Sequence, residues 1–151
     1  MSARYLVIDG HSVIFAWPDL RALHERNRAA ARRALADRLQ QLHDTTDWLV
    51  TLVLDGKLGT VVSTGPRKRT DMVISYATAD QTADSIIERL VGASGVAGEI
   101  LVITADEAEK LTVESLGAMT ASPSWLREEL KIEGASFTGE LERVHRSARW
   151  K

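Results

Sequence analysis

The sequence predicts an α/β domain built around a parallel β-sheet, and three observations lead to this expectation. Short apolar segments rich in β-forming residues alternate along the chain with segments whose apolar residues recur at helical spacing. The strand-like segments are continuously apolar, as expected of strands that are buried on both faces. The chain has 151 residues, which is the length of one domain. Strands that alternate with helices pair in parallel through right-handed crossovers.

Three strands, one helix and one loop are predicted in the first half of the chain. Tyr5–Ile8 is an apolar run typical of a buried strand. Arg26–His43 has apolar residues at helical spacing with arginines between them, which indicates an amphipathic helix. Trp48–Leu54 is a second buried strand and Met72–Tyr76 a third. Lys57–Asp71, which contains two glycines and a proline, is predicted to be a loop.

The second half of the chain continues the alternation. Thr82–Val91 is predicted to be a helix, with Thr82 as its N-cap and Ser85 completing a capping pattern. Glu99–Ile103 is the fourth predicted strand, and Glu107–Leu116 the helix that follows it.

One further helix is expected near the end of the chain. Ser122 or Ser124 is its predicted N-cap, with Pro123 near the first turn. The polar segment after it is predicted to be helical and prone to fray. We therefore expect a single domain over residues 1–151, in which residues from about 138 to 151 form a flexible or helical extension.

Composition limits the kinds of cross-link, metal site and cellular location that we expect for the protein. The chain has no cysteine, so it can form neither a disulfide framework nor a thiolate metal site. The N-terminus lacks the charged-then-apolar pattern of a signal peptide, and no apolar run approaches membrane-spanning length. We therefore expect a soluble, cytoplasmic protein without a membrane partner.

Acidic residues follow the predicted strands at the point where each strand ends. Asp9, Asp55 and Asp106 come at or just after the carboxyl ends of three strands. Asp84 lies in the first turn of the helix after another strand. Because ligands of open parallel sheets bind at the carboxyl ends of the strands, we expect these four acids to meet at one edge of the sheet.

Carboxylates that converge on one cleft repel one another unless a cation lies between them. Mg²⁺ or Mn²⁺ prefers oxygen ligands, keeps some of its waters and is commonly shared with substrate phosphates, which favours phosphodiester hydrolysis. The simpler interpretation is that each aspartate is a turn or cap residue. Asp106 would then cap the next helix, and Asp84 would favour the first turn of its own helix. These structural roles do not exclude metal binding, and the shared topological position of the four acids favours the metal site.

The formal net charge of −2 gives no overall attraction for a polyanion, so any polyanion would have to bind at a local basic patch. One short basic run is a candidate for such a patch. Arg67, Lys68 and Arg69 lie in the predicted loop after the second strand, on the side of the acids. They could contact phosphates on either side of a cleaved bond. A solvated loop is an equally weighted interpretation of so short a run.

Four segments together resemble a known family. They are YLVIDGHSVIFAWPDL, VLDG, TADSIIERL and VITADEAE, and they are spread over most of the chain. The sequence resembles the YacP-like NYN domain family, a branch of the PIN-like ribonucleases. The resemblance implies a PIN-like three-layer α/β/α sandwich, an acidic cluster that binds a divalent metal, and cleavage of RNA. It also implies a possible link to mRNA at the ribosome, since bacterial members of this branch act as endoribonucleases and at least one is linked to translating ribosomes.

The resemblance also assigns residues by position. Asp9, Asp84 and Asp106 match the acidic centre of the family, and Asp55 matches a motif acid whose role is less certain. Glu88 lies one helical turn after Asp84 on the same face, and is a further candidate ligand.

The first motif departs from the family pattern at two positions. The family usually has Asp-Gly-Tyr-Asn, whereas this chain has His11 and Ser12 in the last two places. Ser12 offers a shorter hydroxyl that can still orient a water or a phosphate, so we keep it as a catalytic candidate. His11 is either a base or phosphate contact or, as the preferred interpretation, a partly buried substitute for the aromatic tyrosine.

Two other α/β classes and one other function are alternatives to the nuclease. A phosphotransfer receiver domain needs an acidic pair after the first strand, and a haloacid-dehalogenase phosphatase needs an aspartate where this chain has His11. Both are disfavoured. The serious alternative is an RNA- or ribosome-binding adaptor that keeps the fold and has lost efficient metal chemistry through Ser12.

Overall fold

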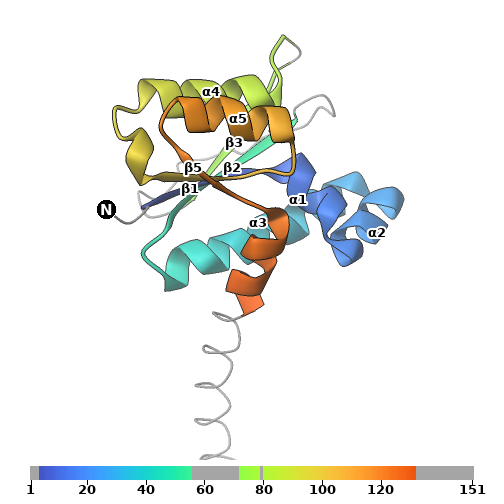
Figure 1. Cartoon of the computed structure of the whole chain (residues 1–151). Coiled ribbons are helices and arrows are strands. Elements are labelled where there is room, and N and C mark those ends of the chain that lie inside the picture. The colour runs from blue at the N-terminus through green and yellow to red at the C-terminus, as the bar shows by residue number, and fades with distance from the viewer. Residues whose placement is uncertain (1–3, 56–71, 79, 132–151) are drawn as a thin grey trace, which may run out of the picture.

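The computed structural model describes residues 4–55, 72–78 and 80–131 of the chain. A sheet of five parallel strands forms its centre, as the alternating pattern predicted (Figure 1). The strands are β1 (Tyr5–Asp9), β2 (Leu49–Asp55), β3 (Val73–Ala77), β4 (Ile100–Ile103) and β5 (Met119–Ala121). Their order across the sheet is β3-β2-β1-β4-β5, so β1 lies in the middle.

The helices of the described chain complete the α/β architecture. They are α1 (Gly10–Ala16), α2 (Pro18–Arg26), α3 (Arg28–Thr45), α4 (Ala83–Ala93) and α5 (Glu107–Ser115), with a short 3₁₀ helix η2 (Ala97–Glu99). Residues 123–131 are also helical. Helices α4 and α5 cover one face of the sheet, and α3 lies with the helix of residues 123–131 on the other (Figure 1). The molecule therefore has the three layers implied by the family resemblance.

Two cores hold these layers together, one on each face of the sheet. On one side, Leu6 and Ile8 of β1 pack with buried leucines of α3. On the other side, Val7 of β1 packs with Ile87 of α4 and Val113 of α5. Successive residues of β1 thus point to opposite faces and are buried on both, which explains why the strand reads as an unbroken apolar run.

Two helices and one strand were not predicted from the sequence. Helix α1 follows β1 without a loop, and α2 begins at Pro18, a residue that favours the first position of a helix. The predicted helix from residue 26 starts instead at Arg28, because Asn27 has an extended backbone and its side chain accepts a hydrogen bond from the Ala30 amide at 3.0 Å. Strand β5 has only three residues, too few for a periodic pattern to be recognised.

The end of the described chain is tied to the start. The Trp17 side chain is buried between α1 and α2, and its Nε1 donates to the Pro123 carbonyl oxygen at 2.9 Å. Ser122, rather than Ser124, caps the helix of residues 123–131, since its Oγ accepts from the Trp125 amide at 3.1 Å. The predicted loop 57–71 and the extension 138–151 lie outside the described residues.

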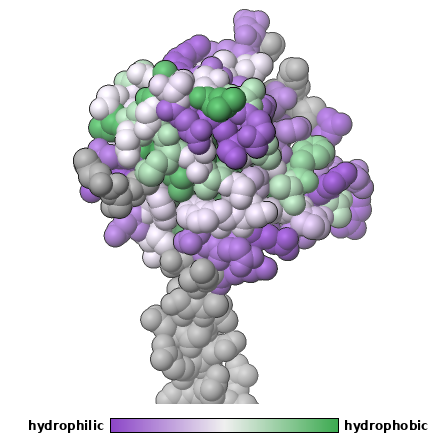
Figure 2. All heavy atoms as spheres, in the orientation of Figure 1, coloured by the Kyte–Doolittle hydropathy of each residue, from purple (hydrophilic) through white to green (hydrophobic). Residues whose placement is uncertain are grey.

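The surface of the described part agrees with a domain that buries its apolar residues inside. In the view of Figure 2, hydrophobic residues are scattered among hydrophilic ones and do not gather in one large patch. In the described residues we find no helix that is both long and apolar enough to cross a membrane.

Candidate functional site

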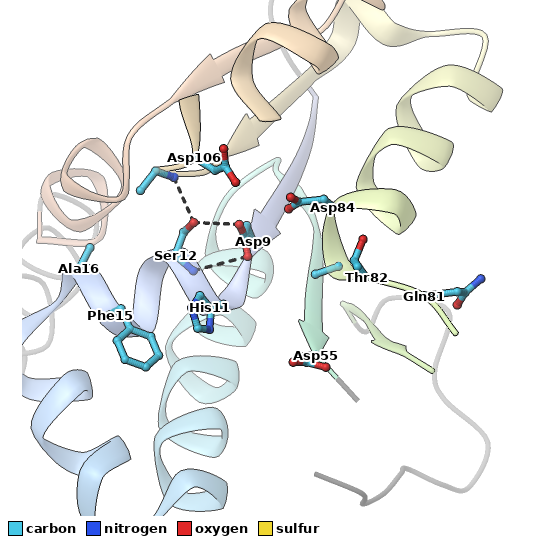
Figure 3. A pocket seen from close by; sticks show the side chains of 12 residues that line it. Asp9, His11, Ser12, Phe15, Ala16, Asp55, Gln81, Thr82, Asp84 and Asp106 are labelled. Atoms are coloured by element: carbon cyan, nitrogen blue, oxygen red, sulfur yellow. Dashed lines mark hydrogen bonds between the residues drawn. The ribbon is translucent and has the colours of Figure 1, made fainter. Parts of the chain in front are cut away.

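A pocket of about 640 Å³ opens where β1 and β2 end and where α1, α4 and α5 begin (Figure 3). It brings together four of the acids that the sequence placed at the carboxyl edge, with Ser12 between them. Its lining residues are Asp9, His11, Ser12, Phe15, Ala16, Asp55, Gln81, Thr82, Ala83, Asp84, Ala105 and Asp106. We call it the acidic pocket.

Asp9 is the most firmly held of the acids. Its residue is only 5% exposed, and its side chain caps α1 by accepting a hydrogen bond from the Ser12 amide at 3.4 Å. Its Oδ2 accepts from Ser12 Oγ at 2.8 Å and from Thr104 Oγ1 at 3.2 Å. These bonds set the direction of the carboxylate at the end of the central strand.

Gly10 allows this strand-to-helix turn to lie tightly against β2. A Cβ atom at position 10 would come within 2.5 Å of Leu54 Cδ2 and 3.0 Å of the Val53 carbonyl oxygen. The glycine is therefore required by close packing, which is what places α1 directly after the acid.

Ser12 connects α1 to the loop after β4. Its Oγ donates to Asp9 and accepts from the Ala105 amide at 3.1 Å. Thr104, which is buried, makes a parallel connection, since its Oγ1 donates to Asp9 and accepts from the Asp106 amide at 3.1 Å. Sequence reasoning missed Thr104, although its place between the last strand residue and Asp106 was the signal that could have found it.

Asp106 is the N-cap of α5, as one of the two sequence interpretations expected. Its Oδ1 accepts from the amides of Ala108 at 2.9 Å and Glu109 at 3.2 Å. Its Oδ2 takes no part in these cap bonds. One carboxylate oxygen therefore holds the helix, while the residue as a whole lines the acidic pocket.

Asp84 lies in the first turn of α4, whose start is fixed by a capping box. The Ser85 amide donates to Thr82 Oγ1 at 3.0 Å, and the Thr82 amide donates to Ser85 Oγ at 3.2 Å. Burial raises the pKa of Asp84, and the charges of Asp9 and Asp106 raise it further. Figure 3 shows its carboxylate turned toward these two acids. The three carboxylates thus share one region of negative charge.

The less certain candidates occupy different places. Asp55 lines the acidic pocket at the end of β2, but Figure 3 shows it apart from the other three acids. Its backbone carbonyl accepts from Arg32 Nη2 at 2.6 Å. Glu88 does not line the described pocket, although its charge contributes to raising the pKa of Asp84. The basic run 67–69 lies outside the described residues.

Glu109 is an acid of this region that sequence reasoning missed. It is 2% exposed, and within the described part of the protein its Oε1 has no hydrogen-bond partner. Burial raises its pKa to about 8, helped by a hydrogen bond to Glu88 and by the charge of Asp84. The available signal was its spacing of four residues from buried Val113, which puts an acid on the apolar face of α5.

The acids fit a partly hydrated divalent ion better than a fully protein-bound one. No three acidic or histidine side chains of the described residues form a group that could by itself hold a metal ion. Mg²⁺, however, keeps several waters and is usually held by one or two carboxylates together with substrate phosphates. The acids of the pocket offer oxygen donors of this kind, and burial together with the charges of Asp9 and Asp106 raises the pKa of Asp84.

His11 differs from its preferred sequence interpretation. It is exposed rather than partly buried, because the first turn of α1 directs it to the pocket. Its ring lies against the Phe15 ring, with centroids 4.5 Å apart and planes tilted by 36°.

A parallel sheet of this order, with acids at its carboxyl edge, agrees with the PIN-like fold that the family resemblance implies. The chain belongs to the YacP-like NYN domain family, whose model matches residues 6–151. It is 30% identical over 129 residues to the uncharacterized protein YacP of Bacillus subtilis (strain 168). This match covers 83% of this chain and 74% of YacP.

Solved structures agree with this assignment of the fold. The crystal structure of Rae1 (YacP) from Bacillus subtilis superposes with a TM-score of 0.81 at 24% identity, covering 95% of this chain and 83% of that chain. The structure of its W164L mutant gives a TM-score of 0.79 at 25% identity, covering 93% and 82% of the two chains.

Proposed function

We propose that this protein is an endoribonuclease that depends on a divalent metal and hydrolyses phosphodiester bonds of RNA. One observation carries the proposal. Asp9, Asp84 and Asp106 line one pocket, and the charges of Asp9 and Asp106, together with burial, raise the pKa of Asp84. Membership of the YacP-like NYN domain family supports it.

Three aspartates of the acidic pocket would hold the metal ion. Asp9, held by Ser12 and Thr104, would present a fixed carboxylate to Mg²⁺ or Mn²⁺. Asp84 and Asp106 would supply further oxygens, the latter through the Oδ2 that does not cap α5. When bound, the ion supplies a Lewis acid that activates a water and neutralises the departing oxygen. Because Asp9 is already oriented, little reorganisation would be needed.

The setting of the reaction is proposed from the sequence. Arg67, Lys68 and Arg69 would contact substrate phosphates. The family resemblance further supports a cytoplasmic enzyme that acts on mRNA at the ribosome.

The first test replaces Asp84 with Asn, which keeps the shape and removes the charge. Cleavage of a single-stranded RNA in Mg²⁺ should fall by roughly a hundredfold or more, because an amide is a poor ligand for a hard cation. EDTA should stop the parent. The matched control is Asp37→Asn, which changes an exposed aspartate of α3. Undiminished cleavage by Asp84→Asn, or by the parent in EDTA, would reject the metal-dependent mechanism.

A second function is favoured by the hydrogen bonds of Ser12. Its hydroxyl already donates to Asp9 and accepts from the Ala105 amide, so its hydrogen is not available to orient a water. An adaptor that binds RNA or the ribosome without cleaving would have this arrangement. It predicts metal-independent RNA binding that Asp84→Asn leaves unchanged, together with no cleavage by the parent.

A further inference from the structure

Three aromatic rings form a continuous row that begins inside the acidic pocket. The ring centroids of His11 and Phe15 are 4.5 Å apart, and those of Phe15 and His24 are 4.9 Å apart with planes at 62°. His11 and Phe15 lie on one face of α1, four residues apart, and both line the pocket. His24 comes from α2. We call these three residues the ring row.

The exposure of the ring row is not explained by packing of the protein itself. Phe15 is 39% exposed, whereas Val13 and Ile14 beside it in the same helix are buried. A phenylalanine packed only for stability would lie on the buried face of the helix. Phe15 instead lines the acidic pocket, near His11 on the same helix (Figure 3).

The inner end of the ring row is close to the acids. His11 follows Asp9 by two residues, and it lines the acidic pocket together with Asp9 and Asp84. A group resting on His11 and Phe15 would therefore lie beside the place where the acids would act.

Two arginines, Arg28 and Arg32, lie within electrostatic range of His24 at the outer end of the ring row. Burial lowers the pKa of His24, and the charges of Arg28, His11 and Arg32 lower it further. A neutral imidazole keeps its ring face available for stacking, while the two arginines supply charge for a phosphate backbone. Aromatic rings next to cations are the combination by which proteins bind single-stranded nucleic acid.

We infer that the ring row is a stacking subsite for an unpaired base of single-stranded RNA, next to the phosphodiester at the acidic pocket. The assignment of that phosphodiester rests on the proposed function, whereas the stacking itself does not. Stacking tolerates every base, because each has a π face, so the subsite would select for an unpaired strand rather than for a sequence.

The test measures binding without cleavage. A short single-stranded RNA carrying the fluorescent base 2-aminopurine is titrated with the full chain in EDTA, and quenching reports stacking. Phe15→Leu keeps an apolar side chain between α1 and α2 but removes the ring, and should weaken binding about tenfold and reduce the quenching. Phe15→Tyr should bind like the parent. The matched control is Tyr76→Leu, which removes a ring of similar exposure (37%) that does not line the acidic pocket.

The outcomes separate this inference from the proposed function. If Phe15→Leu binds and quenches like the parent, or if the parent does not quench, the ring row only packs α1 against α2 and the inference is overturned. That result would not bear on the proposed function, because cleavage in Mg²⁺ is measured separately. Quenching that depends on Phe15 supports the subsite even if no RNA is cleaved. A duplex of the same RNA should bind with little dependence on Phe15, and equal dependence would contradict selection for unpaired bases.

Discussion

Ser12 uses its hydroxyl inside the protein, as a donor to Asp9 and an acceptor from the Ala105 amide. A side chain in this position must satisfy both neighbours before it can act on a ligand. Asparagine has two donors and an acceptor on a longer side chain, so it can keep these bonds and retain a free donor. The serine of this chain therefore favours a fixed Asp9 over contact with a bound water.

Restoring asparagine at this position should raise the rate of cleavage. We expect Ser12→Asn to increase kcat about tenfold with little change in RNA affinity, because the additional donor would act in the transition state. Single-turnover cleavage at saturating Mg²⁺ measures this. Ser12→Ala is the matched control and should be slower than the parent, since Asp9 loses its shortest hydrogen bond. Equal rates for all three proteins would make residues 9–12 a structural turn and favour the adaptor.

Glu109 should make stability depend on pH. Its pKa is about 8 in the folded protein against an ordinary value of 4.5, so the unfolded chain releases this proton first. The free energy of unfolding should therefore fall as pH rises from about 4.5 to 8. Glu109→Gln keeps the shape without the charge, and should raise Tm by roughly 3–6 °C at pH 8 and much less at pH 5.

Thermal unfolding in EDTA gives this comparison without metal. The control is Glu107→Gln, because the Glu107 side chain is 82% exposed on the same helix. A Tm difference between parent and Glu109→Gln that is the same at both pH values would contradict a raised pKa at this residue.

At the scale of the elements, the pocket is built from helix starts. Helices α1, α4 and α5 all begin there, and the cap residues Asp9 and Asp106 are themselves two of its acids. The partial positive charge at the starts of α4 and α5 offsets part of the repulsion among the carboxylates. Any loss of a cap should therefore affect both the stability of the helix and the placement of an acid.

The capping box of α4 offers a test of this coupling. Thr82→Ala removes the acceptor for the Ser85 amide and should cost about 1 kcal/mol, which lowers Tm by roughly 2–4 °C. Because Asp84 is in the first turn of α4, Mn²⁺ affinity should fall as well, as measured by electron paramagnetic resonance. Thr112→Ala in α5 is the control, since its hydroxyl donates only to the Ala108 carbonyl within the helix. Unchanged Mn²⁺ binding by Thr82→Ala would separate the cap from the site.

The predicted and observed elements differ where local sequence is ambiguous. The segment Val13–Phe15 is as apolar as a strand, yet it is part of α1, because the cap at Asp9 and the close packing of Gly10 against β2 start a helix there. The helix break at Asn27 was hidden within a stretch of good helix formers on both sides. Such boundaries depend on backbone turns that periodicity does not report.

At the scale of the whole molecule, topology was enough to bring the acids to one edge. Buried parallel strands are recognised from their apolar runs, and whatever follows them meets at their carboxyl ends. Thr104 and Glu109 could not be assigned in this way. Their roles come from neighbours distant in sequence, such as Asp9 for Thr104 and Glu88 for Glu109.

The central position of β1 has a consequence for synthesis of the protein. It is made before the other strands of this sheet, yet its two neighbours are β2 and β4. A nascent chain can pair β1 with β2 early, but the other edge of β1 stays open until β4 has left the ribosome. Thr104 and Asp106 follow β4, so Asp9 receives the hydrogen bond from Thr104, and the pocket its fourth acid, only late in translation. Such non-local pairing folds slowly, so newly made protein would gain its acidic centre only after most of the domain has been synthesised.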